Sequence, residues 1–241
     1  GAAVSSIVYN GHDLSPYVTA ELVEPAGHAL SPRALAVPGR PGAALLGCEL
    51  PPRVLRVRLF LDAGVTLTAE ERSAIRHELY GWLVAPSGAE LELPGEPGLS
   101  WRDAVVTDAS DWDSLFEDGS CELAFTCFDP VAYGEGKSSA AGTLTVGGTW
   151  ETWPVVTLTA LAGSSVKVAD GLGRYVLVER DFAAGDVVVM DFASEAVTVD
   201  GMDAASGVAV ESTFFSLSPG PHSLTISGCS AHTVAWVERW L

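Results

Sequence analysis

The residues with the clearest capacity for chemistry lie in an acidic, tryptophan-containing stretch in the middle of the chain. They are Trp101, Asp103, Asp108, Asp111, Trp112, Asp113, Glu117 and Asp118. Paired carboxylates beside indoles are what a sugar-cleaving cleft uses, with one acid protonating the leaving oxygen and the other attacking or activating water. The stretch reads, however, as two strand pieces joined by a polar turn, and nothing in it indicates the burial that splits carboxylate pKa values. We therefore expect a solvated acidic loop and rank an acidic glycosidase third among the functional hypotheses.

The other reactive side chains are dispersed. The sequence contains no G-x-S-x-G, no Walker loop, no H-E-x-x-H and no C-x-x-C pair, and its five histidines show no ligand spacing. We therefore expect no enzyme: no catalytic residue, no cofactor-binding residue and no metal site. The four cysteines, Cys48, Cys121, Cys127 and Cys229, are predicted to be buried thiols.

Tryptophans mark the two ends of the second half of the chain. Trp150 and Trp153 stand at its start, and Trp236 and Trp240 stand at its end. Exposed indoles stack on sugar rings, whereas buried indoles pack in a core or at a domain interface, and packing is the favoured interpretation. Glycan contact by Trp150 and Trp153 is kept as an alternative.

Composition limits the partners of the chain. It has 241 residues, of which 48% are hydrophobic, and a formal net charge of −18 from 31 acidic and 13 basic residues. Such a chain folds, and it has no basic cluster to attract nucleic acid or an anionic membrane. No apolar run approaches the roughly 18 residues of a membrane span, and the first ten residues lack a basic region. The acidity is uneven: residues 1–58 hold five arginines and four acids, whereas residues 62–129 hold three arginines and fifteen acids.

The elements that must position these residues are mainly strands. One amphipathic helix is predicted over about residues 68–84, because Ile75, Leu79, Trp82 and Leu83 have helical spacing. Thr68 with Glu71 forms a capping box at its start. Two segments alternate with a period of two and predict half-exposed strands. These are Arg53 to Phe60, with its arginines outward, and Cys121 to Cys127, with Cys121, Leu123, Phe125 and Cys127 on a core face.

The chain divides into two predicted domains, residues 1–136 and residues 137–241. The stretch from Tyr133 to Trp153 is rich in small residues and is expected to be flexible. Beyond it, short strands separated by turn residues predict a β-sandwich without a helix. The predicted strands are 165–169, 174–179, 186–190, 196–200, 213–217, 222–227 and 233–239.

An arm is predicted within the first domain, over about residues 24–47. Proline and glycine are frequent there, and only a short extended piece precedes the turn at Val37 to Arg40. A long excursion of this kind is usually ordered by something outside its own domain, because exposed strand edges need a partner. The arm therefore indicates obligatory assembly.

Seven short segments occur in a characteristic order along the chain. They are Ile7 to Leu14 (IVYNGHDL), Val37 to Ala43 (VPGRPGA), the helix from Arg72 to Leu83, Leu123 to Gly134 (LAFTCFDPVAYG), Trp153-Pro154, Phe214 to His222 (FFSLSPGPH) and Arg239-Trp240-Leu241. In this order and spacing they resemble the distal tail proteins of siphophages, the long-tailed, non-contractile bacteriophages.

The resemblance implies a fold. It implies an N-terminal split β-barrel-like domain with one α-helix and a C-terminal β-sandwich like a galectin or carbohydrate module. The arm would embrace the neighbouring subunit, with the interface at Arg33, Leu35, Val37, Pro38, Gly39 and Arg40. The second domain has no long insertion of the kind that holds receptor-binding proteins in some relatives.

The resemblance also implies a function. The chain would be a structural hub of the phage tail tip in the virion, made in the host cytoplasm, with no cofactor and no membrane contact. Six copies would form a ring that joins the tail tube protein to the tail-tip or tail-associated protein. DNA would pass through its channel without specific binding, so acidic side chains are expected to outnumber basic ones along the lumen. A carbohydrate-binding module that aids attachment to a host-surface glycan is the alternative.

Overall fold

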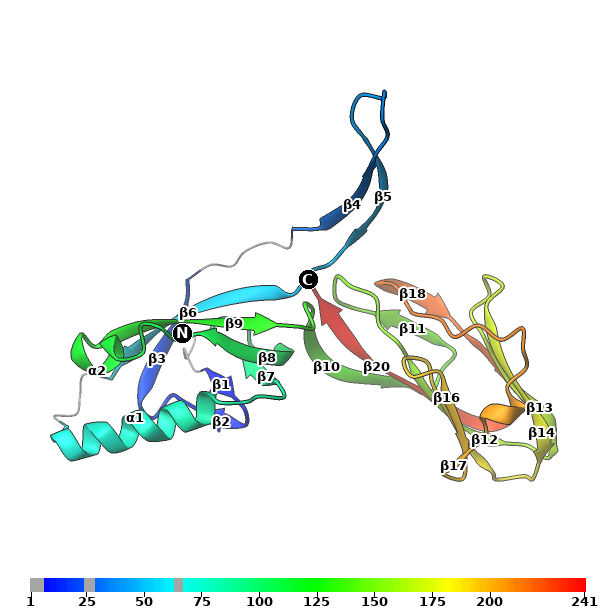
Figure 1. Ribbon diagram of the computed structural model, residues 1–241. Coiled ribbons are helices and arrows are strands. Elements are labelled where there is room, and N and C mark those ends of the chain that lie inside the picture. Colours follow the sequence, from blue (N-terminus) through cyan, green and yellow to red (C-terminus); the bar gives the residue numbers. More distant parts are fainter. Residues whose placement is uncertain (1–6, 24–28, 63–66) are drawn as a thin grey trace. The chain divides into compact units, whose positions relative to one another are not determined.

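A computed structural model describes residues 7–23, 29–62 and 67–241 (Figure 1). The described residues form twenty strands, two α-helices and one 3-10 turn, η1 (Ala205–Gly207). The prediction of a mainly β fold is therefore confirmed. The chain separates into two compact units between Tyr133 and Gly134. The predicted boundary lies three residues further along.

The first unit is built on one antiparallel sheet with the strand order β3-β6-β9-β8-β7-β1-β2, and the start of β10 also pairs with β8. The bounds are β1 (Val8–Tyr9), β2 (His12–Asp13), β3 (Val18–Leu22), β6 (Arg53–Leu61), β7 (Ala89–Glu92), β8 (Ser100–Asp108), β9 (Ser120–Cys127) and β10 (Ala132–Ser139).

Alternation places one face of this sheet in the core. Leu55, Val57 and Leu59 of β6 are buried, and β9 contributes the buried face that contains both Cys121 and Cys127. The opposite face stays in solvent, where Arg56 and Arg58 each contact Glu122 at 3.4 Å. Both predicted strands are thereby confirmed.

The main helix, α1 (Ala69–Leu83), begins at the predicted cap. Glu71 N donates to Thr68 Oγ1 at 3.2 Å, and Thr68 N donates to the Glu71 carboxylate at 2.8 Å. The Thr68 N–H and hydroxyl lower the pKa of Glu71 because they donate to its charged form. Leu79 and Leu83 are buried and hold the helix to the unit.

A second helix corrects two predictions, that of one α-helix in this domain and that of a plain polar turn before residue 120. The helix α2 (Ser114–Glu117) forms because Leu115 and Phe116 are both buried, and a single helical turn brings both to the core. Ser114 Oγ donates to Asp111 at 2.7 Å just before it.

The second unit is a sandwich. One sheet has the order β17-β16-β15-β12-β20-β10, and the others are β14-β13-β19 and β11-β18. The bounds are β11 (Thr143–Val146), β12 (Val155–Ala160), β13 (Gly163–Ala169), β14 (Tyr175–Phe182), β15 (Val187–Asp191), β16 (Ala196–Val199), β17 (Met202–Asp203), β18 (Gly220–Ser223), β19 (Thr225–Ser227) and β20 (Cys229–Trp240).

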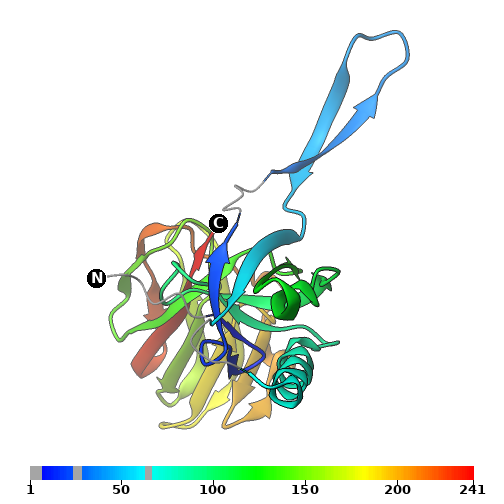
Figure 2. The ribbon, with the colours of Figure 1, turned by 90° about the vertical axis from the view of Figure 1, so that its left-hand side faces the viewer.

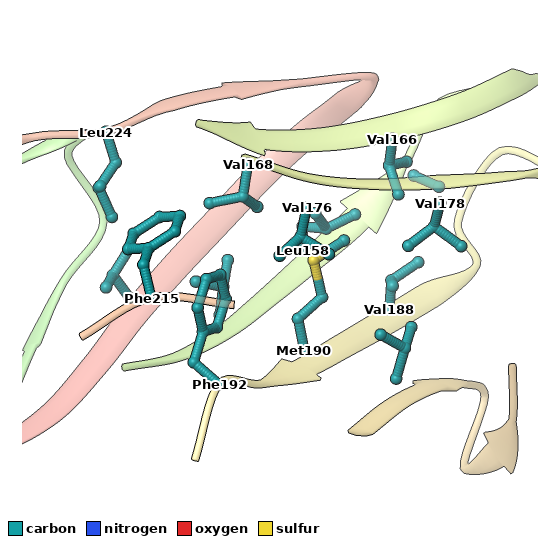
Figure 3. Close-up of a cluster of buried hydrophobic side chains, with 14 of the residues drawn as sticks. Leu158, Val166, Val168, Val176, Val178, Val188, Met190, Phe192, Phe215 and Leu224 are labelled. Atoms are coloured by element: carbon teal, nitrogen blue, oxygen red, sulfur yellow. The ribbon is translucent and has the colours of Figure 1, made fainter. Parts of the chain in front are cut away.

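Its core is aliphatic and aromatic. Figure 3 shows Val166, Val168 and Val176 directed toward Leu158 and Met190 of the facing sheet. Phe192 packs edge-on against Phe215, with ring centroids 4.8 Å apart. The second unit therefore has a closed core of its own.

Two sequence expectations fail in this unit. Residues 213–217 form no strand: Thr213 N donates to Tyr175 O, and Leu217 and Thr152 make only an isolated bridge. The stretch from Tyr133 to Trp153, expected to be flexible, contains β10 and β11, because neighbouring strands supply hydrogen bonds that its small residues do not predict.

The cysteine prediction is half right. Cys121 and Cys127 are buried, and burial raises the pKa of each thiol to about 12. Cys229 is half-buried, whereas Cys48 is exposed because it lies in a hairpin that has no core.

Candidate functional site

The candidate site is the arm, an antiparallel hairpin of β4 (Ser31–Ala36) and β5 (Ala43–Glu49). The two strands form a sheet of their own, and both views show no third strand beside them (Figures 1 and 2). At the tip Arg40 N donates to Val37 O at 3.2 Å, and Gly39 and Gly42 have φ near +80°, which favours glycine. Residues 24–28 of the predicted arm lie outside the described residues.

The arm exposes apolar side chains. Every residue of β4 is exposed, and so is every residue of β5 except the half-buried Ala44. The exposed large side chains are Leu30, Leu35, Val37, Leu45 and Leu46, and Leu45 and Leu46 keep about two thirds of their surface in water. Exposed apolar ribbons with free strand edges are typical of surfaces that a partner covers.

The six residues predicted for the subunit interface all lie exposed on this arm. Arg33 and Leu35 share one face of β4, and Arg33 forms an ion pair with Glu49. Val37, Pro38, Gly39 and Arg40 make the turn. Sequence reasoning missed the returning strand, above all Leu45 and Leu46. The pair Leu45-Leu46 in an otherwise small-residue segment was the available signal.

The predicted glycan contacts do not stand out as an exposed pair. Trp150 is half-buried, and Trp153 packs against the sandwich core. Between them Thr152 is buried and donates from Oγ1 to Val237 O at 2.6 Å. At the other end of the unit, Trp236 is buried and Trp240 is half-buried. This arrangement is that of packing residues.

The acidic stretch does not form a catalytic pair. Its six carboxylate residues are exposed, whereas Trp101 and Trp112 are buried. The Ser110 N–H lowers the pKa of Asp108 because it donates to the charged carboxylate. A sugar-cleaving acid needs the opposite shift, toward a raised pKa.

The described part of the chain offers neither a metal-ligand cluster nor a membrane-crossing helix. There, no group of three His, Cys, Asp or Glu side chains is arranged to hold a metal ion. Neither α1 nor α2 combines the length and apolar character that a membrane-crossing helix requires.

Comparison with known proteins identifies the relatives of this fold. Residues 147–240 match the family described as siphovirus-type tail component, C-terminal domain. No curated protein matches the sequence. The crystal structure of Dit (gp 19.1) from phage SPP1, described as a paradigm of the hub adsorption apparatus in phages that infect Gram-positive bacteria, is similar with a TM-score of 0.80 and 18% identity, and covers 99% of this chain and 100% of that chain.

A second solved structure, the phage P2 baseplate in its activated conformation with Ca, is similar with a TM-score of 0.54 and 8% identity over 97% of each chain. At these identities the two likenesses establish the fold. The sequence resemblance is confirmed: residues 147–240 match the siphovirus-type tail component family, and the whole chain shares the fold of SPP1 Dit.

Proposed function

We propose that this protein is a non-enzymatic hub of a phage tail tip that assembles as a homo-hexameric ring. The observation that supports it most directly is the arm, whose apolar residues are exposed along both strands and meet no third strand. The full-length likeness to SPP1 Dit supplies the context of a hub.

A closed ring gives each arm a partner. In a cyclic, head-to-tail assembly every subunit offers the same arm and the same receiving surface, so no arm is left uncovered when the ring closes. In the proposed ring the first unit would form the wall and the sandwich would point outward. The ring would join the tail tube protein to the tail-tip protein in the virion.

The channel of this ring would pass DNA without binding it. Residues 62–129 carry fifteen acids against three arginines, and a lumen with this excess would repel phosphates during ejection. A ring structure in which basic side chains dominate the lumen would contradict this part of the proposal.

The first test is the mass of the assembled protein. Native mass spectrometry of the full chain is expected to show a species of about 151 kDa, six copies of the 25.1 kDa chain. Addition of the tail-tip partner is expected to retain that ring in a larger complex. A monomer at every concentration, with or without tail partners, would refute the proposal.

A further inference from the structure

The register of the arm gives its two faces different chemistry. Residues paired across an antiparallel ladder lie on the same face, and faces alternate along each strand. The pairs Pro32 with Cys48, Ala34 with Leu45, and Ala36 with Ala43 define one face, here called the apolar face. All six side chains on it are apolar or a thiol.

The opposite face of the arm carries polar and charged side chains. Its pairs are Ser31 with Glu49, Arg33 with Gly47, and Leu35 with Ala44, and it carries the ion pair between Arg33 and Glu49. A register shift between Arg33 and Ala34 leaves Leu46 unpaired. Solvent suits an ion pair, whereas a flat face of small apolar side chains gains free energy only when another surface covers it.

The first unit contains a concave surface whose side chains, like those of the apolar face of the arm, are mainly apolar. A groove of about 300 Å³ lies between the end of α1 and β8, lined by Tyr80, Val84, Pro86, Val105, Thr107 and Ala109 among others. Tyr80 and Val84 are about half exposed, although both are large and apolar. The side chains that line the groove are therefore apolar apart from Thr107 and the Tyr80 hydroxyl, and the groove is open.

Charge distinguishes this groove from two other surfaces of the first unit. Residues 29–50 carry two arginines and one acid, and Arg40 stands at the tip. Asp108 and Asp111 are exposed and lie within two residues of the lining residue Ala109 in the sequence. In contrast, the hollow at the start of α1 is lined, among the described residues, by Arg72 and Arg76 and by no carboxylate side chain, and only Arg76 has an ion-pair partner there, Asp113 at 3.3 Å, so the hollow offers the tip less attraction.

The solvent-exposed face of the sheet in the first unit is also a less suitable docking surface for the arm than the groove is. Besides Val54 and Phe60 it exposes Arg56 and Arg58, which already contact Glu122. An arm with a net positive charge would meet like charge there, and like charges across an interface disfavour a partner.

The arm is long enough to reach another copy. From Ala29 to the turn at Arg40 the strand would extend about 35 Å at roughly 3.3 Å per residue. A unit of this size has a radius of gyration of only about 14 Å. The occupant of the groove is therefore assigned to a second copy of this chain.

We infer that the apolar face of the arm, anchored by Leu45, docks in the Tyr80–Val84 groove of the next subunit, with Arg40 toward Asp108 and Asp111. The inference rests on the proposed ring, and it names the surfaces that close it. It places the ion-pair face, with Arg33 and Leu35, toward solvent. The sequence prediction instead includes Arg33 and Leu35 among the interface residues.

The test compares two matched pairs of variants in the full chain, after native mass spectrometry has shown that the wild-type protein forms an oligomer. Leu45→Glu and Leu35→Glu place the same charge on opposite faces of the arm. Val84→Glu lies in the groove, whereas Ala74→Glu lies on an exposed position of α1 outside it. Leu45→Glu and Val84→Glu are expected to weaken assembly at least about 30-fold, and their partners less than about threefold.

The native thiol of Cys48 supplies an independent readout, because it lies on the apolar face and is the exposed cysteine of the chain. Alkylation at Cys48, followed by peptide mass spectrometry, is expected to be at least about tenfold slower in the oligomer than in Leu45→Glu. Circular dichroism is expected to show that all four variants fold as the wild type does.

Each alternative result has its own meaning. Loss of assembly in Leu35→Glu and not in Leu45→Glu would overturn the assignment of the docking face. Loss in Leu45→Glu with full assembly in Val84→Glu would overturn the groove. Intact oligomers in all four variants, or fast alkylation of Cys48 in the oligomer, would overturn the inference and leave the ring standing. A wild-type monomer would instead refute the ring itself.

Discussion

Two hairpins of this chain have similar architecture and opposite surroundings. In the sandwich, β13 and β14 pair Val166 with Val178 and Val168 with Val176, and all four side chains are buried. In the arm, β4 and β5 pair Ala34 with Leu45 and Ala36 with Ala43, and these side chains are exposed. Both hairpins have one apolar face, but only the sandwich hairpin finds its covering surface within its own unit.

The composition of the two faces reflects this difference. Valine packs well on a pleated, buried surface and loses little entropy there, because its χ1 angle is already restricted. The alanines of the arm bury too little area to hold a hairpin in water alone, since a two-stranded hairpin is marginal without a third element. The sandwich hairpin is thus stabilised by its own fold, and the arm must be stabilised by assembly.

The largest expected effect comes from placing one charge in each hairpin. Val176→Asp buries a carboxylate without a partner, so we expect it to lower the free energy of unfolding by more than about 4 kcal/mol. Ala34→Asp leaves its carboxylate in water and is expected to change that free energy by less than about 0.5 kcal/mol in the dissociated chain. Urea unfolding followed by circular dichroism measures both.

The contrast between the two hairpins would be wrong if Ala34→Asp lowered the free energy of unfolding of the dissociated chain as much as Val176→Asp does. The arm would then have a covering surface within its own chain. Hydrogen exchange provides the control, because amides of β13 and β14 are expected to be protected in the monomer and those of β4 and β5 to exchange fast.

A smaller effect is expected from turn glycines with the same backbone conformation. Gly228 and Gly39 both have φ near +80°. A Cβ at Gly228 would overlap the carbonyl oxygen of Ser165, whereas a Cβ at Gly39 meets nothing within 4 Å. Gly228→Ala is therefore expected to lower the free energy of unfolding of the sandwich by more than about 2 kcal/mol. Gly39→Ala is expected to add only the strain of the positive φ, about 1 kcal/mol, to the local conformation of the arm.

Calorimetry of the dissociated chain checks the pair of glycine variants. The Gly228→Ala variant is expected to lower the melting temperature of the sandwich, and the Gly39→Ala variant to leave every transition in place, because a marginal hairpin contributes no cooperative melting of its own. Equal shifts in the two variants would show that φ strain alone sets the cost.

The same contrast explains which features could be predicted from the sequence. The capping box of α1 and the buried face of β9 depend on neighbours within a few residues, so spacing alone was sufficient. The existence of the arm followed from its prolines and glycines. The apolar face of the arm could not be predicted from these residues, because the register shift at Leu46 changes which residues of β5 lie on the same face as Ala34.

Features that depend on distant partners could not be predicted either. β10 contains Gly134 and Gly136, which disfavour strands, and it forms because β8 and β20 lie beside it. Residues 213–217 show the opposite case. Their apolar alternation predicts a strand, but Thr213 N donates to Tyr175 O and Leu217 N donates to Thr152 O, and these acceptors lie in different segments of the chain. The packing of Trp153 against the core likewise depends on residues far along the chain.

The smallest expected effect concerns two ion pairs, one in each hairpin. Asp170, in the turn between β13 and β14, has a side chain only 3% exposed, and Arg174 Nε donates to it at 2.6 Å. The backbone N–H groups of Leu172 and Arg174 donate to its other oxygen at 2.8 and 3.0 Å. In the arm, Arg33 and Glu49 keep more than half of their side-chain surface in water. Asp170→Asn is therefore expected to cost about 2 kcal/mol and Glu49→Gln less than about 0.5 kcal/mol.

The pH dependence of the Asp170 contribution further distinguishes the buried ion pair of the sandwich from the exposed ion pair of the arm. Burial alone would raise the pKa of Asp170, but the hydrogen bonds from Arg174 and from the backbone outweigh it and lower the pKa. Because the folded pKa lies below the unfolded value of about 3.9, the carboxylate stabilises the fold fully above that value and loses its contribution as the pH falls through the folded pKa. Urea unfolding is expected to show a constant gap between wild type and Asp170→Asn from pH 7 to about pH 5, and a shrinking gap below about pH 4. A gap that widened on acidification would mean that burial, and not hydrogen bonding, controls this carboxylate.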